Sequence, residues 1–271
     1  MTFKSRTDLA IEHRSFRENA NTQDYIHTRS DDGGIRADVV KILSSKGAEA
    51  LSRPIGEYIT LSFENPPPDT LAESVAKHVK RLLPPNLKRL LTVGLGNREI
   101  TADAIGPYTV DRMTVTGHLD ANAGIRRYAI SPSVFGKTGI ESLSLIQSAK
   151  EASNADALIV IDALAAQSLS RLYRTVQIGN SGIVPGSGVG NHRRAIDEAT
   201  LGVPVIAIGV PTVVSTATLF CDTLERTGRE SLLAEIENDL HEIEPYFVTP
   251  PDADLDTDRL ATLLAQAIDT I

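Results

Sequence analysis

Apolar runs that alternate with helical segments are the feature that most restricts the fold of this chain. Three such runs read as strands, at residues 90–93, 157–161 and 203–210. None of them alternates with polar residues as a strand with one solvated face does, so both faces of each strand need covering. The sequence therefore predicts an α/β fold, with a mainly parallel central sheet flanked by helices.

Amphipathic segments lie between and after these runs. Residues 70–83 place Leu71, Val75 and Val79 at helical spacing and end before two prolines. Residues 142–152 and 255–271 have similar patterns. No repeat or linker interrupts the 271 residues, so we expect a single domain.

The composition excludes several classes of protein. A net charge of -8 argues against direct binding of nucleic acid, which needs a basic surface. A single cysteine, Cys221, excludes an internal disulfide and fits a reducing compartment. The N-terminus lacks the apolar core of a signal peptide, and no apolar run approaches the ~20 residues of a membrane helix. The sequence predicts a cytoplasmic protein that does not bind membranes.

Residues 93–107, VGLGNREITADAIGP, place a Gly-x-Gly after a strand. A dinucleotide loop requires a third glycine where this chain has Glu99, and no Gly-Lys-Ser/Thr of a P-loop follows. A carboxylate at that place would also face the phosphates. The pattern therefore favours a loop that positions Asp103.

Asp162 directly follows the apolar run at 157–161. A buried carboxylate is costly without partners, so Asp162 and Asp103 each have two readings: a helix N-cap or a catalytic group. The carboxyl ends of parallel strands meet at one edge of a sheet, where ligands bind. Two carboxylates at that edge could share a proton and activate water, which is a metal-free route to peptide hydrolysis.

The glycine-rich stretch at residues 182–191 is a candidate substrate-binding loop, because glycines let the backbone approach a ligand closely. A Ser187 nucleophile assisted by His192 is a second reading, although the surroundings do not form a nucleophile elbow. The histidines lack the paired spacing of a zinc helix, and His118 is a candidate for lining the cleft. The candidate substrate-binding residues are Gly186, Ser187, Gly188, Asn191 and His118. We expect no metal and no cofactor.

The chain resembles the germination protease (spore protease) family of endospore-forming bacteria, peptidase family A25, over nearly its whole length. The matching stretches are RTDLAIE at 6–12, PIGEYITL at 54–61, VGLGNREITADAIGP at 93–107, VTGHL at 115–119, FGKTGIES at 135–142, IDALAAQS at 161–168, PGSGVGN at 185–191, TLGVPVIAIGVPTVV at 200–214 and VTP at 248–250.

This resemblance implies a fold similar to hydrogenase maturation endopeptidases, a homotetramer and an atypical aspartic-type mechanism. The family's two catalytic aspartates fall on Asp103 and Asp162. The implied substrates are small acid-soluble spore proteins, cut in the spore core during germination. The family is made as a zymogen that cuts itself between an acidic residue and a hydrophobic-Ala pair. Asp8 and Leu9 match that pattern, so we expect a pro-segment at residues 1–8 and a protease domain at 9–271.

Two alternatives remain open at this point. The first is a metal-dependent maturation endopeptidase that binds nickel through carboxylates and a histidine. The second is a catalytically silent peptide-binding tetramer.

Overall fold

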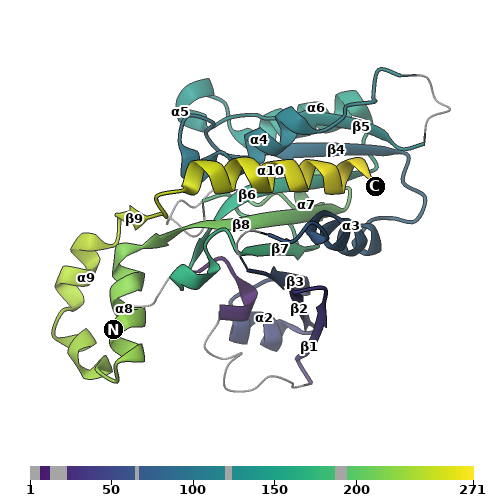
Figure 1. Ribbon diagram of the computed structural model, residues 1–271. Helices are drawn as coiled ribbons and strands as arrows, with labels where there is room; N and C mark the ends of the chain where they lie inside the picture. The colour runs from purple at the N-terminus through teal and green to yellow at the C-terminus, as the bar shows by residue number, and fades with distance from the viewer. Residues whose placement is uncertain (1–6, 13–22, 65–66, 120–123, 187–193) are drawn as a thin grey trace.

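The structure is a computed structural model, and it describes residues 7–12, 23–64, 67–119, 124–186 and 194–271 (Figure 1). The described residues build one sheet with helices on both faces, which confirms the predicted single α/β domain. The strands are β1 (Tyr25–Asp32), β2 (Ile35–Ile42), β3 (Gly56–Ser62), β4 (Arg89–Gly94), β5 (Arg126–Ile130), β6 (Ala157–Ala166), β7 (Thr175–Gly179), β8 (Val205–Ser215) and β9 (Phe247–Val248).

The sheet order is β1-β2-β3-β7-β8-β6-β4-β5, with β9 paired to the end of β8. The neighbours β8–β6, β6–β4 and β4–β5 are parallel, whereas β1, β2, β3 and β7 continue the sheet in antiparallel pairs. The three apolar runs of the sequence fall in β4, β6 and β8. These strands form the middle of the sheet, where both faces are covered.

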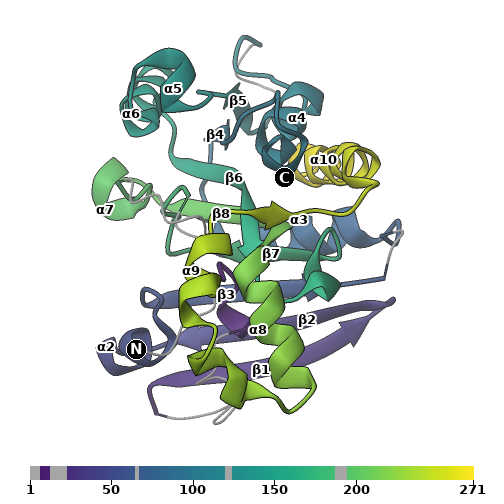
Figure 2. The same cartoon turned by 90° about the vertical axis from the view of Figure 1, so that its left-hand side faces the viewer.

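Helices cover both faces of the sheet, as the quarter-turn view shows (Figure 2). One face carries α3, α4 and α10, and the other carries α5, α6 and α7. An arm made of α8 and α9 follows β8 (Figure 1). The helices are α2 (Ser45–Leu51), α3 (Leu71–Leu82), α4 (Ile105–Arg112), α5 (Phe135–Thr138), α6 (Ser142–Ser153), α7 (Glu198–Leu201), α8 (Thr216–Arg226), α9 (Glu237–Ile243) and α10 (Ala253–Asp269).

The side chains of β6 show how the core is divided. Ala157, Ile159 and Ile161 belong to the larger apolar cluster, which includes the buried faces of α3 and α10. Leu158 and Val160 belong to a second cluster with α6. Successive strand residues point to opposite faces of the sheet. Asp162, two residues after Val160, therefore lies on the same face as Leu158 and Val160.

Two further sequence readings can be compared with the fold. Cys221, the single cysteine, lies on α8 and is only 2% exposed, so its thiol belongs to a buried helix face. Among the described helices, none combines the length and apolar character that crossing a bilayer requires.

Candidate active site

Asp103 closes a short 3-10 helix, η2 (Thr101–Asp103), that follows β4 and the glycine loop. Its carboxylate Oδ2 accepts a hydrogen bond from the backbone N–H of Asn97 at 2.8 Å. The next helix, α4, begins after Ala104, and no side chain caps it. Asp103 is therefore not the N-cap of α4, and the reading in which it only caps a helix is wrong.

The glycine loop folds tightly around this aspartate. Gly96 has a φ of 112°, in the region that side chains rarely adopt. A Cβ atom at Gly96 would overlap the carbonyl oxygen of Asp103 and lie 2.9 Å from its Oδ1. The second glycine of the Gly-x-Gly thus allows a close approach to the carboxylate of Asp103 rather than to a phosphate.

Asp162 lies inside β6, not at its end, because the strand continues to Ala166. It is 7% exposed and pairs in register with Gly209 of β8. Its Oδ1 accepts a hydrogen bond from the backbone N–H of Ala163 at 3.0 Å. No helix starts at Asp162, so here too the helix-cap reading is wrong; the apolar run predicted only the first half of the strand.

The segments that carry the two aspartates are tied to each other. The N–H of Leu95 donates to the carbonyl of Ile161 at 2.8 Å, which joins the glycine loop to the residue before Asp162. Gly106 of α4 packs against both segments: a Cβ there would overlap the Leu95 carbonyl oxygen and lie 2.6 Å from that of Ile161. Asp103 and Asp162 therefore lie at the same edge of the sheet.

A threonine of β8 supports the same arrangement. Thr212 is fully buried, and its hydroxyl donates to the carbonyl of Ala102 at 2.6 Å. Since β8 neighbours β6, this bond anchors η2 next to the strand of Asp162. Sequence reasoning missed Thr212, although it follows the long apolar run of β8.

The predicted processing bond between Asp8 and Leu9 lies in the core. Asp8 pairs with Ala165 at the end of β6: its N–H donates to the Ala165 carbonyl, and its Oδ2 accepts from the Ala165 N–H, both at 2.9 Å. The side chain of Gln177 donates to the Asp8 carbonyl at 2.9 Å and accepts from the N–H of Ala10 at 2.8 Å. Leu9, between them, has no exposed surface.

Glu12 follows in the short helix η1 (Ala10–Glu12). Its Oε2 accepts hydrogen bonds from the Thr7 hydroxyl at 2.5 Å and the Gln167 N–H at 2.8 Å. Arg171 lies 3.8 Å from its Oε1. Burial raises the pKa of the Glu12 carboxyl above its ordinary value, and these partners offset only part of that effect.

The candidate substrate loop is described only in part. Gly186 has a φ of 73°, which suits glycine, and a backbone bridge between Ile183 and Ile196 closes the base of the loop. Ile196 belongs to the apolar cluster of Leu158 and Val160, so the base lies on the face of β6 that bears Asp162. Ser187, Gly188, Asn191 and His192 lie outside the described residues.

His118 lies far from this edge of the sheet. It is exposed, in a turn whose neighbours Thr116 and Gly117 donate to the carbonyl of Arg127, near the start of β5. Arg127 of β5 and Ala157 of β6 both pair with the same residue of β4, so they lie at the same level of the sheet. Ala157 is five residues before Asp162 on β6. At ~3.3 Å per residue this is about 16 Å, so the structure does not bring His118 together with the aspartates.

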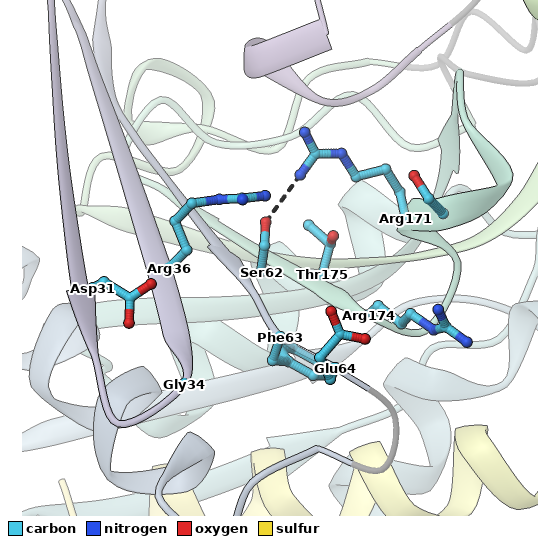
Figure 3. Close-up of a pocket in the computed structure, with 10 residues that line it drawn as sticks. Asp31, Gly34, Arg36, Ser62, Phe63, Glu64, Arg171, Arg174 and Thr175 are labelled. Atoms are coloured by element: carbon cyan, nitrogen blue, oxygen red, sulfur yellow. Dashed lines mark hydrogen bonds between the residues drawn. The ribbon is translucent and has the colours of Figure 1, made fainter.

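Within the described parts of the chain, no three His, Cys, Asp or Glu side chains cluster as a metal site does. Sequence reasoning also missed Gln177 and Arg171, whose guanidinium donates to the hydroxyl of Ser62 at the end of β3 at 2.9 Å (Figure 3). Their positions depend on which strands become neighbours, and no local pattern encodes that.

Comparison with known proteins identifies the family. The model of the germination protease family, Peptidase_A25, matches residues 5–245. The germination protease of Clostridium tetani is 37% identical, covering 97% of this chain and 94% of the relative. That of Caldanaerobacter subterraneus is 36% identical, covering 97% and 92%, and that of Priestia megaterium is 38% identical, covering 84% and 69%.

Among solved structures, the hydrogenase maturation protease HycI of Thermococcus kodakarensis matches with a TM-score of 0.38 and 14% identity. The match covers 70% of this chain and 98% of that one, and is too weak to carry an argument. The family model and the curated relatives are sufficient by themselves: the chain belongs to the germination protease family and is an endopeptidase.

Proposed function

We propose that the protein cuts small acid-soluble spore proteins during germination, by a mechanism in which Asp103 and Asp162 act together. One carboxylate takes a proton from water, which attacks the peptide carbonyl, while the other carboxyl gives a proton to the leaving nitrogen. The observation that carries this proposal is the tie between Leu95 and Ile161, because it holds the two aspartate segments at one edge of the sheet.

The fold also supports a peptide substrate at this edge. Ala165 already binds the chain at Asp8, because its carbonyl accepts from the Asp8 N–H and its N–H donates to the Asp8 carboxylate. We propose that the enzyme first cuts its own chain between Asp8 and Leu9 and works as a homotetramer in the spore core. Because Leu9 is fully buried, this cut has to follow release of the contacts with Gln177.

The test compares the full-length protein with its Asp103→Asn and Asp162→Asn variants on a purified acid-soluble spore protein. Intact masses of both components are followed with and without EDTA. We expect chelator-resistant cuts after acidic residues, absent in both variants. Asp111→Asn is the matched control, since Asp111 is exposed on α4 and pairs with Arg98.

Two results would contradict the proposal. Loss of cleavage in EDTA, restored by a divalent cation, would favour the metal-dependent alternative. Inactivity of both the full-length protein and a chain that starts at Leu9 would favour the silent peptide-binding protein.

A further inference from the structure

The pairing of β6 with β8 is irregular at Thr212. Leu164 pairs with Pro211, but the next residue of β6, Ala165, pairs with Val213, so Thr212 has no opposite residue on β6. Such β-bulges are rare between parallel strands. They bend the strand that contains them and occur often next to active sites, where they re-aim a side chain. The bulge at Thr212 therefore points to a functional role for this residue.

The side chain of Thr212 is polar in apolar surroundings. Val210 and Val214, on either side of it in β8, both belong to the larger apolar cluster, and Thr212 itself is fully buried. A hydroxyl in such a place is costly unless it forms a hydrogen bond. A hydroxyl has one proton to donate, and that of Thr212 goes to the carbonyl of Ala102 in η2, at 2.6 Å.

The helix η2 is held through its backbone. None of its three residues is buried, so the burial of apolar side chains contributes little to fixing it. Thr257 of α10, which is also fully buried, donates to the carbonyl of Thr101 at 3.4 Å. The bond from Thr212 is the shorter of the two, so we expect it to hold η2 more strongly.

The backbone around the bulge is itself fixed by hydrogen bonds. The carbonyl of Thr212 accepts from the hydroxyl of Thr249, and that of Pro211 accepts from the N–H of Tyr173, both at 2.9 Å. Tyr173 is 1% exposed and has a φ of 54°, which is rare for a bulky side chain. Its hydroxyl lies 3.3 Å from that of Thr257. Backbone conformations of this kind persist where the surroundings impose them, and they cluster at active sites.

The bond from Thr212 acts directly on the position of Asp103. The carbonyl of Ala102 belongs to the peptide unit that leads into Asp103. On β8, Thr212 comes three residues after Gly209, and Gly209 pairs with Asp162. One strand thus holds the segment of the first aspartate and pairs with the second. A misplacement of about 1 Å in such an arrangement can cost ~100-fold in rate.

We propose that Thr212 is a positioning residue for peptide hydrolysis. From the bulge in β8 its hydroxyl holds η2, and thereby holds the carboxylate of Asp103 in the place relative to Asp162 that the reaction needs. Thr257 supports the same helix more weakly. The role in catalysis rests on the proposed function, whereas the holding of η2 does not and is tested separately.

The first test compares kcat and KM on a fluorogenic peptide with one acidic-hydrophobic-Ala cut site. Thr212→Val keeps the shape of the side chain but removes the hydroxyl. We expect kcat to fall about 10- to 100-fold with KM changed less than about twofold, because binding of the peptide does not depend on this bond. Thr212→Ser retains the hydroxyl and should restore most of kcat. Thr212→Ala also removes the hydroxyl, and it takes the place of Thr212→Val if that variant does not fold.

Thr109→Val is the matched control. Thr109 is fully buried too, and its hydroxyl donates to the carbonyl of Ile105 within α4 at 2.8 Å. This variant loses a buried hydrogen bond that does not involve η2, so its kcat should stay near that of the unmodified protein. A near-normal kcat in Thr212→Val, an equal fall in Thr109→Val, or no recovery in Thr212→Ser would overturn the positioning role.

Hydrogen–deuterium exchange tests the holding of η2 without a substrate. The N–H of Asn97 donates to the Asp103 carboxylate, and the N–H of Asp103 donates to the carbonyl of Ile100. Exchange at both should rise about tenfold in Thr212→Val and stay unchanged in Thr109→Val. Unchanged exchange at residues 97–103 in Thr212→Val would overturn the proposal even if activity fell.

Asp103→Asn separates this proposal from the proposed function. A normal kcat in Asp103→Asn would contradict the two-aspartate mechanism and, with it, the catalytic role of Thr212. An inactive Asp103→Asn together with a normal Thr212→Val would contradict the role of Thr212 alone.

Discussion

The backbone N–H of Leu95, the middle residue of the Gly-x-Gly loop before Asp103, donates at 2.8 Å to the carbonyl oxygen of Ile161, the residue before Asp162. Such a bond between the end of β4 and the middle of β6 continues the parallel ladder one residue beyond β4. Because the chain leaves the ladder at Gly96, η2 turns back toward β6 and β8. The site is thus assembled where regular strand pairing stops.

Replacing either aspartate by asparagine should abolish peptide hydrolysis without unfolding the protein. Asparagine keeps an oxygen that can accept from the N–H of Asn97 or of Ala163 but has no acid-base function. We expect kcat/KM to fall by at least about 100-fold for Asp103→Asn and Asp162→Asn, with melting curves close to that of the unmodified protein. If a variant keeps near-normal kcat/KM, the aspartate replaced in it is not required for the mechanism.

Gly96→Ala should both destabilise the protein and lower its activity. The new methyl group meets the Asp103 carbonyl, and the residue must also adopt a positive φ. We expect a loss of about 1–3 kcal/mol in urea unfolding. Gly139→Ala is the control for backbone strain alone, since Gly139 has a φ of 67° but open space around its Cβ position. Equal losses in the two variants would show that contact with Asp103 is unimportant.

Gln177→Ala should loosen the segment around the predicted processing bond. The amide of Gln177 holds both the carbonyl of Asp8 and the N–H of Ala10, and its loss leaves two buried backbone groups unsatisfied. Hydrogen–deuterium exchange should rise at residues 8–11 and little elsewhere, with a stability loss of about 1–3 kcal/mol. The Gln266→Ala variant serves as control, because Gln266 is exposed. Unchanged exchange at Ala10 would contradict the proposed role of Gln177 in holding this segment.

Glu12→Gln should change how stability depends on pH. Burial raises the pKa of Glu12 in the folded protein above its ordinary value of 4.5, so between these two values the folded state binds more protons than the unfolded state. This contribution to stability is largest below pH 4.5 and is lost as the pH rises through the raised pKa. Glutamine does not titrate, so the variant should gain stability relative to the unmodified protein over that window.

The measurement is urea unfolding of both proteins from pH 4.5 to 7.5. Arg171 attracts Glu12 only while that carboxyl is ionised, so this attraction is already contained in the pKa of Glu12, and the slope of the difference between the two curves reports the net shift. A stability difference that does not vary with pH would mean that Glu12 has no raised pKa.

The sequence determined the parts of the molecule that depend on local periodicity. The apolar runs of β4, β6 and β8 and the amphipathic patterns of α3, α6 and α10 were readable because burial on two faces, or on one helical face, leaves a pattern within ten to twenty residues. The sequence also singled out Asp162, which directly follows an apolar run, and Asp103, which follows the Gly-x-Gly loop; their catalytic role stays a prediction.

Only the tertiary structure decided what lies opposite these residues. The edge strand β5 and the antiparallel strand β7 carry no comparable run, and their place depends on pairing with distant segments. The same holds for Gln177 at Asp8, Thr212 at Ala102, and Arg171 at Ser62, which long-range pairing brings together. His118 shows the converse: this candidate site residue lies near the start of β5, at the beginnings of the parallel strands, whereas the aspartates lie toward their ends.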